Sequence, residues 1–136
     1  MPQTGAVDTV VKTGLPTTSQ IALALLAFLA IGPFVTGLDL WLRFLPDYPA
    51  IAHFRAAGAL GHGLWIGSGV LALATIALIV RRQFAAAAIV GAAFTAANVW
   101  GGNLVWAQTT VGNWLALGAF ALCAASAIGN RAAARQ

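Results

Sequence analysis

The sequence predicts an all-α protein, a four-helix transmembrane bundle, from its composition and from the length of its uncharged segments. The chain has 136 residues, of which 60% are hydrophobic and 7% are charged, and its mean hydropathy is +0.87. Soluble domains carry about 25% charged residues. Because so few charged residues cannot cover the water-exposed surface of a folded domain of this size, we expect lipid to surround most of the chain. Alternating segments of the kind that form transmembrane barrels are absent from the sequence.

The uncharged segments are long enough for four membrane-spanning helices. Charges are absent from residues 21–38, from residues 56–80 and from every position between Arg82 and Arg131. One span needs about 20 apolar residues, so the last segment holds two spans if the chain turns near AQTTVGN at 107–113. The expected spans lie near residues 20–43, 55–80, 84–106 and 112–130.

The connections between these spans are short, so residues 20–130 are expected to form one domain. RRQ at 81–83 allows only a tight turn, which makes the helices on either side of it antiparallel. The first connection, RFLPDYPAIAH at 43–53, contains two prolines and is expected to be irregular. Residues 1–19 are expected to form an N-terminal tail and residues 131–136 a C-terminal tail.

The basic residues are distributed unevenly between the two membrane sides that this arrangement defines. Five of the seven fall on one side and two on the other. Loops rich in Lys and Arg stay in the cytoplasm, so we expect both termini to be cytoplasmic and the protein to lie in a bacterial inner membrane. The net charge of +4 is explained in this way, and no nucleic-acid partner is expected. The five are Lys12, Arg81, Arg82, Arg131 and Arg135, and the two are Arg43 and Arg55.

Four aromatic residues are expected to anchor the protein at the outer surface of the bilayer. Trp and Tyr are enriched there because their rings are apolar and carry a polar group. The predicted anchors are Trp41, Tyr48, Trp106 and Trp114.

Small residues four positions apart predict close contacts between helices. Gly63 and Gly67 form such a pair on the second predicted helix, and Ala88, Ala92 and Ala96 form a stripe on the third. Small side chains let two backbones approach where lipid provides no hydrophobic driving force. These faces could pack within the chain, or they could join it to a second copy or to a larger membrane complex.

The two histidines, His53 and His62, cannot share a metal or a haem if they lie on one continuous helix. They are nine residues apart, which corresponds to two and a half turns and about 13.5 Å. A shared site would require the helix to begin after His53. We expect His53 to be a solvated side chain at the interface, and no metal site is predicted.

Four polar residues, Asp39, His62, Asn98 and Asn103, are expected to face the interior of the bundle. Polar groups within a membrane normally find partners there, and His62 and Asn98 have similar predicted depths. Asp39 lies one helical turn before Arg43 and is placed to pair with it. The four residues either form an interhelical hydrogen-bond clamp or line a cavity that binds a quinone, a haem or a small solute.

Two helix ends resemble those of a family of small bacterial membrane proteins. FVTGLDLW ends the first predicted helix and VWGGNLVWAQTTVG the third. An uncharacterised family of small bacterial multi-pass membrane proteins, a domain of unknown function, carries Gly-x-x-Asp and Gly-Gly-x-Leu-Val-Tyr at such ends and is similar to this chain over residues 28–112. This chain lacks the family's opening His-Pro helix, differs at Asn103 and has a further helix. The resemblance implies a multi-pass fold and no particular activity. The corresponding residues are Gly37, Asp39, His62, Gly101, Gly102, Leu104 and Val105, with Trp106 in place of the tyrosine.

The sequence therefore predicts a small, non-catalytic accessory or ligand-binding membrane subunit without a cofactor. It has no phosphate-binding loop, no nucleophile–base pair and no metal-ligand spacing. The alternative is a redox module that holds haem b or a quinone through His62. A third class, a small-solute transporter, is disfavoured because the chain has no glutamate and Asp39 lies near a helix end.

Overall fold

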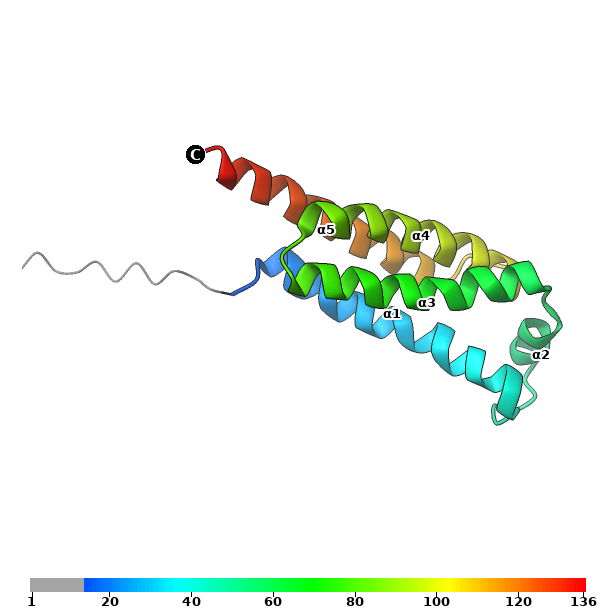
Figure 1. Cartoon of the computed structure of the whole chain (residues 1–136). Helices are drawn as coiled ribbons and strands as arrows, with labels where there is room; N and C mark the ends of the chain where they lie inside the picture. Colours follow the sequence, from blue (N-terminus) through cyan, green and yellow to red (C-terminus); the bar gives the residue numbers. More distant parts are fainter. Residues whose placement is uncertain (1–13) are drawn as a thin grey trace, which may run out of the picture.

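The computed structural model describes residues 14–136, and within that range every regular element is a helix. The predicted all-α fold is confirmed. Residues 1–13, which include most of the expected N-terminal tail and Lys12, lie outside the described residues. The helices are α1 (Thr17–Leu42), α2 (Pro49–Ala56), α3 (Ala59–Val80), α4 (Phe84–Trp106) and α5 (Val111–Ala134) (Figure 1).

The four long helices have the length and composition of membrane spans. α1, α3, α4 and α5 contain 26, 22, 23 and 24 residues and are apolar enough to cross a bilayer. Each packs against two others: α1 and α4 both contact α3 and α5. The chain turns back after each long helix, so the start of α1 and the end of α5 lie at one end of the bundle (Figure 1). We call this the terminal end, and the opposite one, which carries α2, the α2 end.

Two predicted boundaries differ from the observed ones. α1 begins at Thr17, directly after Pro16, so the last three residues of the expected N-terminal tail are helical. Pro16 is the N-cap of α1, and its carbonyl accepts a hydrogen bond from the Gln20 backbone N–H at 3.0 Å. α5 continues to Ala134, through most of the expected C-terminal tail. Alanine is the best helix former, and nothing in that segment stops the helix.

The predicted second span is not one helix. α2 ends at Ala56 and α3 begins at Ala59, with Gly58 in an extended conformation as the N-cap of α3. Glycine has a low helix propensity and commonly occupies a cap. His53 and His62 therefore lie on different helices, and the separation expected along one continuous helix does not apply.

The interior of the bundle contains mostly small side chains. Its main cluster includes Ala22 and Leu26 of α1, Ala72 of α3 and Phe94 of α4. A second cluster at the α2 end is built from large side chains, namely Phe54, Trp65 and Val105, with Leu40, Ala57 and Trp106 packed against it.

A glycine of α4 makes a close helix–helix contact. A Cβ added at Gly101 would lie 2.6 Å from the Trp65 backbone nitrogen and 2.9 Å from the carbonyl carbon of Leu64, both on α3. Only a glycine permits this approach, because a Cβ cannot be accommodated so near another backbone.

The predicted packing residues Gly63 and Gly67 do not serve this purpose within the chain. A Cβ added at either would meet nothing within 4 Å. In the predicted stripe of α4, Ala88 is half-buried and packs against the core, but Ala92 and Ala96 are exposed, whereas Ala87 and Gly91 are buried. So many small residues occur on these helices that several stripes have the same spacing, and the spacing does not indicate which one faces the interior.

Candidate functional site

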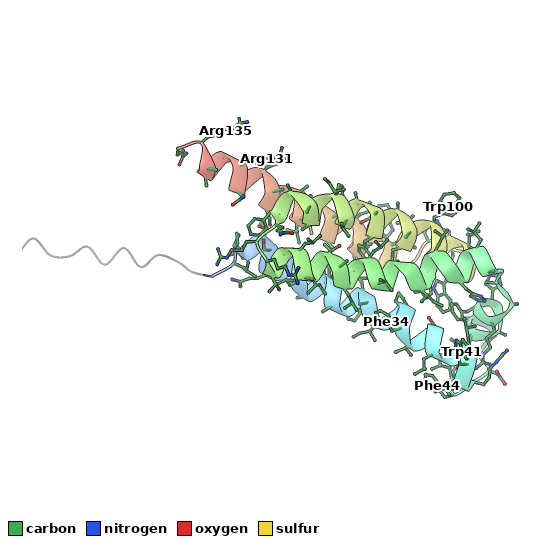
Figure 2. The ribbon with its side chains drawn as sticks, viewed as in Figure 1. Phe34, Trp41, Phe44, Trp100, Arg131 and Arg135 are labelled. Atoms are coloured by element: carbon green, nitrogen blue, oxygen red, sulfur yellow. The ribbon has the colours of Figure 1, made fainter. Side chains whose placement is uncertain are left out.

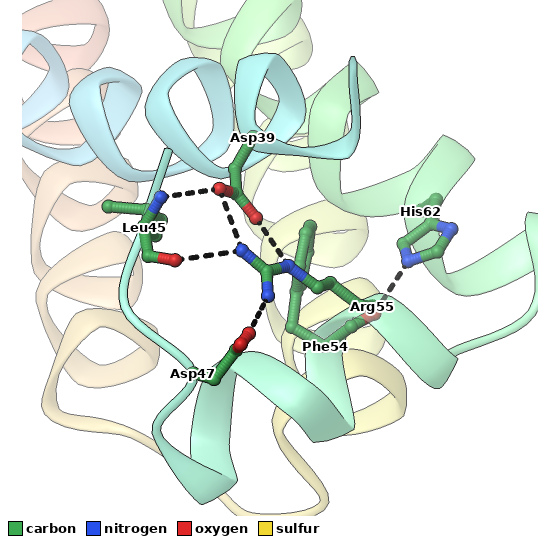
Figure 3. Close-up of polar contacts among 6 residues, drawn as sticks. All are labelled: Asp39, Leu45, Asp47, Phe54, Arg55 and His62. Atoms are coloured by element: carbon green, nitrogen blue, oxygen red, sulfur yellow. Dashed lines mark hydrogen bonds and ion pairs between the residues drawn. The ribbon is translucent and has the colours of Figure 1, made fainter. Parts of the chain in front are cut away.

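At the α2 end, the buried carboxylate of Asp39 is held by Arg55. The Asp39 side chain is fully buried and that of Arg55 is 11% exposed. Arg55 Nε donates to Asp39 Oδ2 at 2.8 Å, and its NH2 group donates to Asp39 Oδ1 at 3.0 Å. The backbone N–H of Leu45 also donates to Asp39 Oδ1, at 2.7 Å. This bidentate arrangement satisfies both carboxylate oxygens (Figure 3).

Arg55 also binds the loop that joins α1 to α2. Its NH1 group donates to Asp47, and its NH2 group donates to the Leu45 carbonyl at 2.9 Å. Hydrogen bonds from the guanidinium to Asp39 raise the pKa of Arg55 above its already high ordinary value, so this side chain stays charged. We call Asp39, Leu45, Asp47 and Arg55 the Arg55 cluster. It fastens the end of α1, the loop and α2 together.

The predicted pairing of Asp39 with Arg43 is wrong. Arg43 is the C-cap of α1, with a left-handed φ of 51°, and its backbone N–H donates to the Asp39 carbonyl. Since the helix ends at Arg43, its side chain does not occupy the helical position from which it would reach Asp39. Arg55 was not predicted as a partner. The prolines Pro46 and Pro49, which turn the chain, were the available signal that α2 returns to α1.

His62 joins α3 to α2 rather than binding the other predicted site residues. Its Nε2 lies 2.7 Å from the carbonyl oxygen of Phe54. Because a carbonyl only accepts, Nε2 carries the proton and donates. The ring also lies against Phe54, with centroids 5.0 Å apart. His53 is exposed on α2.

Trp106, one of the four predicted anchors, packs against aromatic rings of the protein. Its ring stacks on Phe54, with centroids 5.2 Å apart, and meets Trp65 edge to face at 5.9 Å. Trp41, Tyr48 and Trp114 are exposed, at 87%, 65% and 67% respectively. Their location at a membrane surface stays a prediction.

Asn98 pairs with Asn113 of α5, not with His62. Asn113 Nδ2 donates to the Asn98 backbone carbonyl at 3.1 Å and to Asn98 Oδ1 at 3.2 Å. Asn103 is exposed, and its Oδ1 accepts from Thr109 at 3.3 Å. Asp39, His62, Asn98 and Asn103 thus have four separate sets of partners, and no hydrogen bond joins any two of them within residues 14–136.

The orientation of the Asn98 amide follows from a chain of hydrogen bonds. Asn113 Oδ1 accepts from the Thr110 backbone N–H at 2.8 Å in the capping box of α5. Asn113 must therefore direct its NH₂ group toward Asn98, and Asn98 must present its oxygen in return. Asn98 Nδ2 is consequently left without a hydrogen-bond partner among the described residues. Because no fully buried side-chain nitrogen or oxygen of these residues lacks a partner, Nδ2 is accessible at the surface of the molecule, although Asn98 as a whole is only 1% exposed.

Asn98 lines an apolar groove of about 320 Å³, which we call the Asn98 groove. Trp65 forms part of its wall, and the indole N–H of Trp65 donates to Thr36 Oγ1 at 2.9 Å, which fixes the ring. Two positions of the groove are glycines. Neither Trp65 nor Asn113 was predicted to belong to a site. The lining residues are Phe28, Leu29, Ile31, Gly32, Trp65, Asn98 and Gly112.

The comparisons with known proteins return no relative. No family model matches the chain, and no curated protein or solved structure matches it either. The resemblance to the family of unknown function thus stays a prediction, and Gly37 and Asp39 are separated by one residue rather than by the two in Gly-x-x-Asp. Within residues 14–136, no group of three His, Cys, Asp or Glu side chains is placed to hold a metal ion. Fold and composition define the class as a small integral membrane protein with four apolar helices.

Proposed function

We propose that this chain is a non-catalytic, ligand-binding subunit of a bacterial inner membrane. Its ligand is a membrane-soluble molecule that carries a carbonyl group, held in the Asn98 groove, and an isoprenoid quinone is the class that fits best. The supporting observation is the unpartnered Nδ2 of Asn98, which belongs to a residue lining an otherwise apolar groove.

A hydrogen-bond donor in this position is unfavourable unless a ligand pairs with it. An unpaired polar group in an apolar environment costs about 1–3 kcal/mol, and the lipid chains that reach Asn98 Nδ2 through the open groove offer no acceptor. A carbonyl oxygen seated at Asn98 would remove this cost. The donor therefore selects a ligand with an acceptor over a plain hydrocarbon.

The other lining residues favour a flat, apolar molecule. Gly32 and Gly112 contribute no side chains, and the rings of Phe28 and Trp65 provide aromatic surface. Phe28 and Ile31 are 62% and 57% exposed, so the groove opens on the side of the bundle that faces lipid. A quinone ring could enter from the bilayer while its isoprenoid chain stays in the membrane. The volume is at the lower end of the range of ligand pockets.

The contacts of His62 argue against this residue as the cofactor ligand. Its Nε2 proton is committed to the Phe54 carbonyl, so binding iron through that nitrogen would require breaking the link between α2 and α3. We therefore assign the quinone to Asn98 rather than to His62, and we do not propose a haem.

Equilibrium binding of a short-chain benzoquinone to the purified protein in detergent tests the proposal. Replacing Asn98 by Ala removes the donor and should weaken binding about fivefold, the effect of about 1 kcal/mol. Asn103→Ala is the matched control, because Asn103 lies on the same helix but is exposed. Equal affinities of the wild type and Asn98→Ala would contradict the proposal.

A second variant separates loss of the ligand site from loss of the fold. Gly32→Ala adds a methyl group 3.6 Å from the Trp65 ring, an ordinary contact, and narrows the groove without removing a hydrogen bond. It should weaken quinone binding while thermal stability stays unchanged or rises. Unaltered binding in Gly32→Ala would mean that the quinone lies elsewhere.

A further inference from the structure

A second groove runs between α4 and α5 at the terminal end of the bundle. It has a volume of about 240 Å³. Alanines form most of its walls: Ala85 and Ala88 on α4, and Ala124 and Ala127 on α5, with Ile89 and Ile128 beside them. The small side chains leave an open groove that runs along the two helices. Its lining residues on α5 extend from 124 to 131, about 10 Å along the helix axis.

Arg131 lines the same groove and has no counter-charge within the described residues. The structure gives it no hydrogen bond or ion pair there, and it is exposed. Both acidic residues of the described range, Asp39 and Asp47, bind Arg55 at the α2 end. Figure 2 shows Arg131 on the last turn of α5 and Arg135 directly after it, at the terminal end. The apolar groove therefore extends to the positively charged Arg131 at the terminal end of the bundle.

We propose that this groove is a binding site for an anionic phospholipid. One acyl chain lies along the alanine walls, and the phosphate binds the Arg131 guanidinium. This combination of an apolar channel and a basic residue matches an amphiphile that has an acidic headgroup. A guanidinium presents two parallel N–H groups to a phosphate, and basic pockets between transmembrane helices bind acidic lipid headgroups. A neutral apolar ligand would leave Arg131 without an ion pair.

Native mass spectrometry of the protein released from detergent, with phosphatidylglycerol or phosphatidylcholine added, tests this proposal. The wild type should retain one phosphatidylglycerol molecule in several-fold preference to phosphatidylcholine. Arg131→Gln should lose this preference, whereas Arg135→Gln should keep it, because Arg135 does not line the groove. If both variants lose the preference for phosphatidylglycerol equally, the lipid is attracted by the overall positive charge of this end rather than by Arg131, and the proposed site is wrong.

Two further measurements separate a lipid from other occupants. Ala124→Leu fills the groove and should reduce retention of phosphatidylglycerol with Arg131 intact. Thermal unfolding of each variant identifies any that fails to fold. Glycerol phosphate, which lacks acyl chains, should not displace the lipid; efficient displacement would mean that Arg131 binds only phosphate. A dimer that disappears in Ala124→Leu and carries no lipid would assign the groove to a second copy of the chain.

Discussion

The four polar residues predicted to face the interior together, Asp39, His62, Asn98 and Asn103, have separate partners and form no common cluster. Asp39 receives a guanidinium, His62 donates to the backbone of another helix, and Asn98 pairs with Asn113. Each contact joins a different pair of elements. The four residues therefore do not form one interhelical clamp, and of the four only Asn98 belongs to the ligand site that we propose.

At the residue scale, we expect the purified protein to be colourless and His62→Leu to be moderately less stable than the wild type. The substitution removes the donor to the Phe54 carbonyl, an interaction of about 1 kcal/mol, and leaves the rest of the bundle unchanged. Thermal unfolding and a visible spectrum measure the two effects. His53→Leu is the control, since His53 is exposed. A Soret band that is lost only in His62→Leu would restore the haem interpretation.

At the scale of elements, the Arg55 cluster decides how α1, α2 and the loop between them are joined. Breaking a buried ion pair by removing one partner is destabilising, because the other charge stays buried without compensation. Arg55→Gln should therefore cause a large loss of thermal stability and make the loop at 43–48 sensitive to protease. Arg43→Gln, the same change at the arginine that sequence spacing favoured, should have little effect.

A double substitution checks this assignment. Asp39→Asn combined with Arg55→Gln removes both charges and should recover part of the stability that Arg55→Gln loses. If the double variant is as unstable as the sum of the single variants, the two residues do not act as a pair.

The contact between α3 and α4 depends on Gly101. Gly101→Ala would place a methyl group within 3 Å of the α3 backbone and should destabilise the protein by about 1–3 kcal/mol, the usual effect of overpacking. Gly63→Ala is the matched substitution at a position with no neighbour within 4 Å, and it should be tolerated. Thermal unfolding of the two variants in the same detergent compares them. Equal losses would mean that Gly63 also faces a neighbour.

At the scale of the whole molecule, the charges of the described residues are divided between the two ends. Arg81, Arg82, Arg131 and Arg135 belong to the α3–α4 turn and the end of α5, at the terminal end. At the α2 end, the positive charge of Arg55 is matched by nearby carboxylates. We therefore expect the terminal end to be cytoplasmic.

Reporter fusions test this orientation. A fusion after Gln136 should give the cytoplasmic signal, and one inserted at Asp47 should give the opposite signal. Asp47 is suited to the insertion because its side chain is 87% exposed in the loop before α2. The same signal at both sites would remove a span from the arrangement.

The sequence by itself predicted that lipid surrounds this protein and that it contains four long helices. A chain with 7% charged residues cannot cover itself with polar groups, and in lipid a segment must satisfy its backbone hydrogen bonds internally, which favours helices. Length then decided their number. The break between α2 and α3 was not determined, because Gly58 is one of 15 glycines in the chain, many of which lie within helices.

Only the tertiary structure decided which faces and which polar residues meet. A helix that is apolar on every side has no polar face to indicate which side is buried. The buried positions of α4 could therefore not be distinguished from its exposed alanines by sequence. Asp39 binds a residue 16 positions away rather than four, because the loop returns α2 to α1. The free N–H group of Asn98 depends on Thr110 through Asn113 of another helix. Such contacts depend on which elements lie close together in space, and the spacing of residues within one helix does not indicate this.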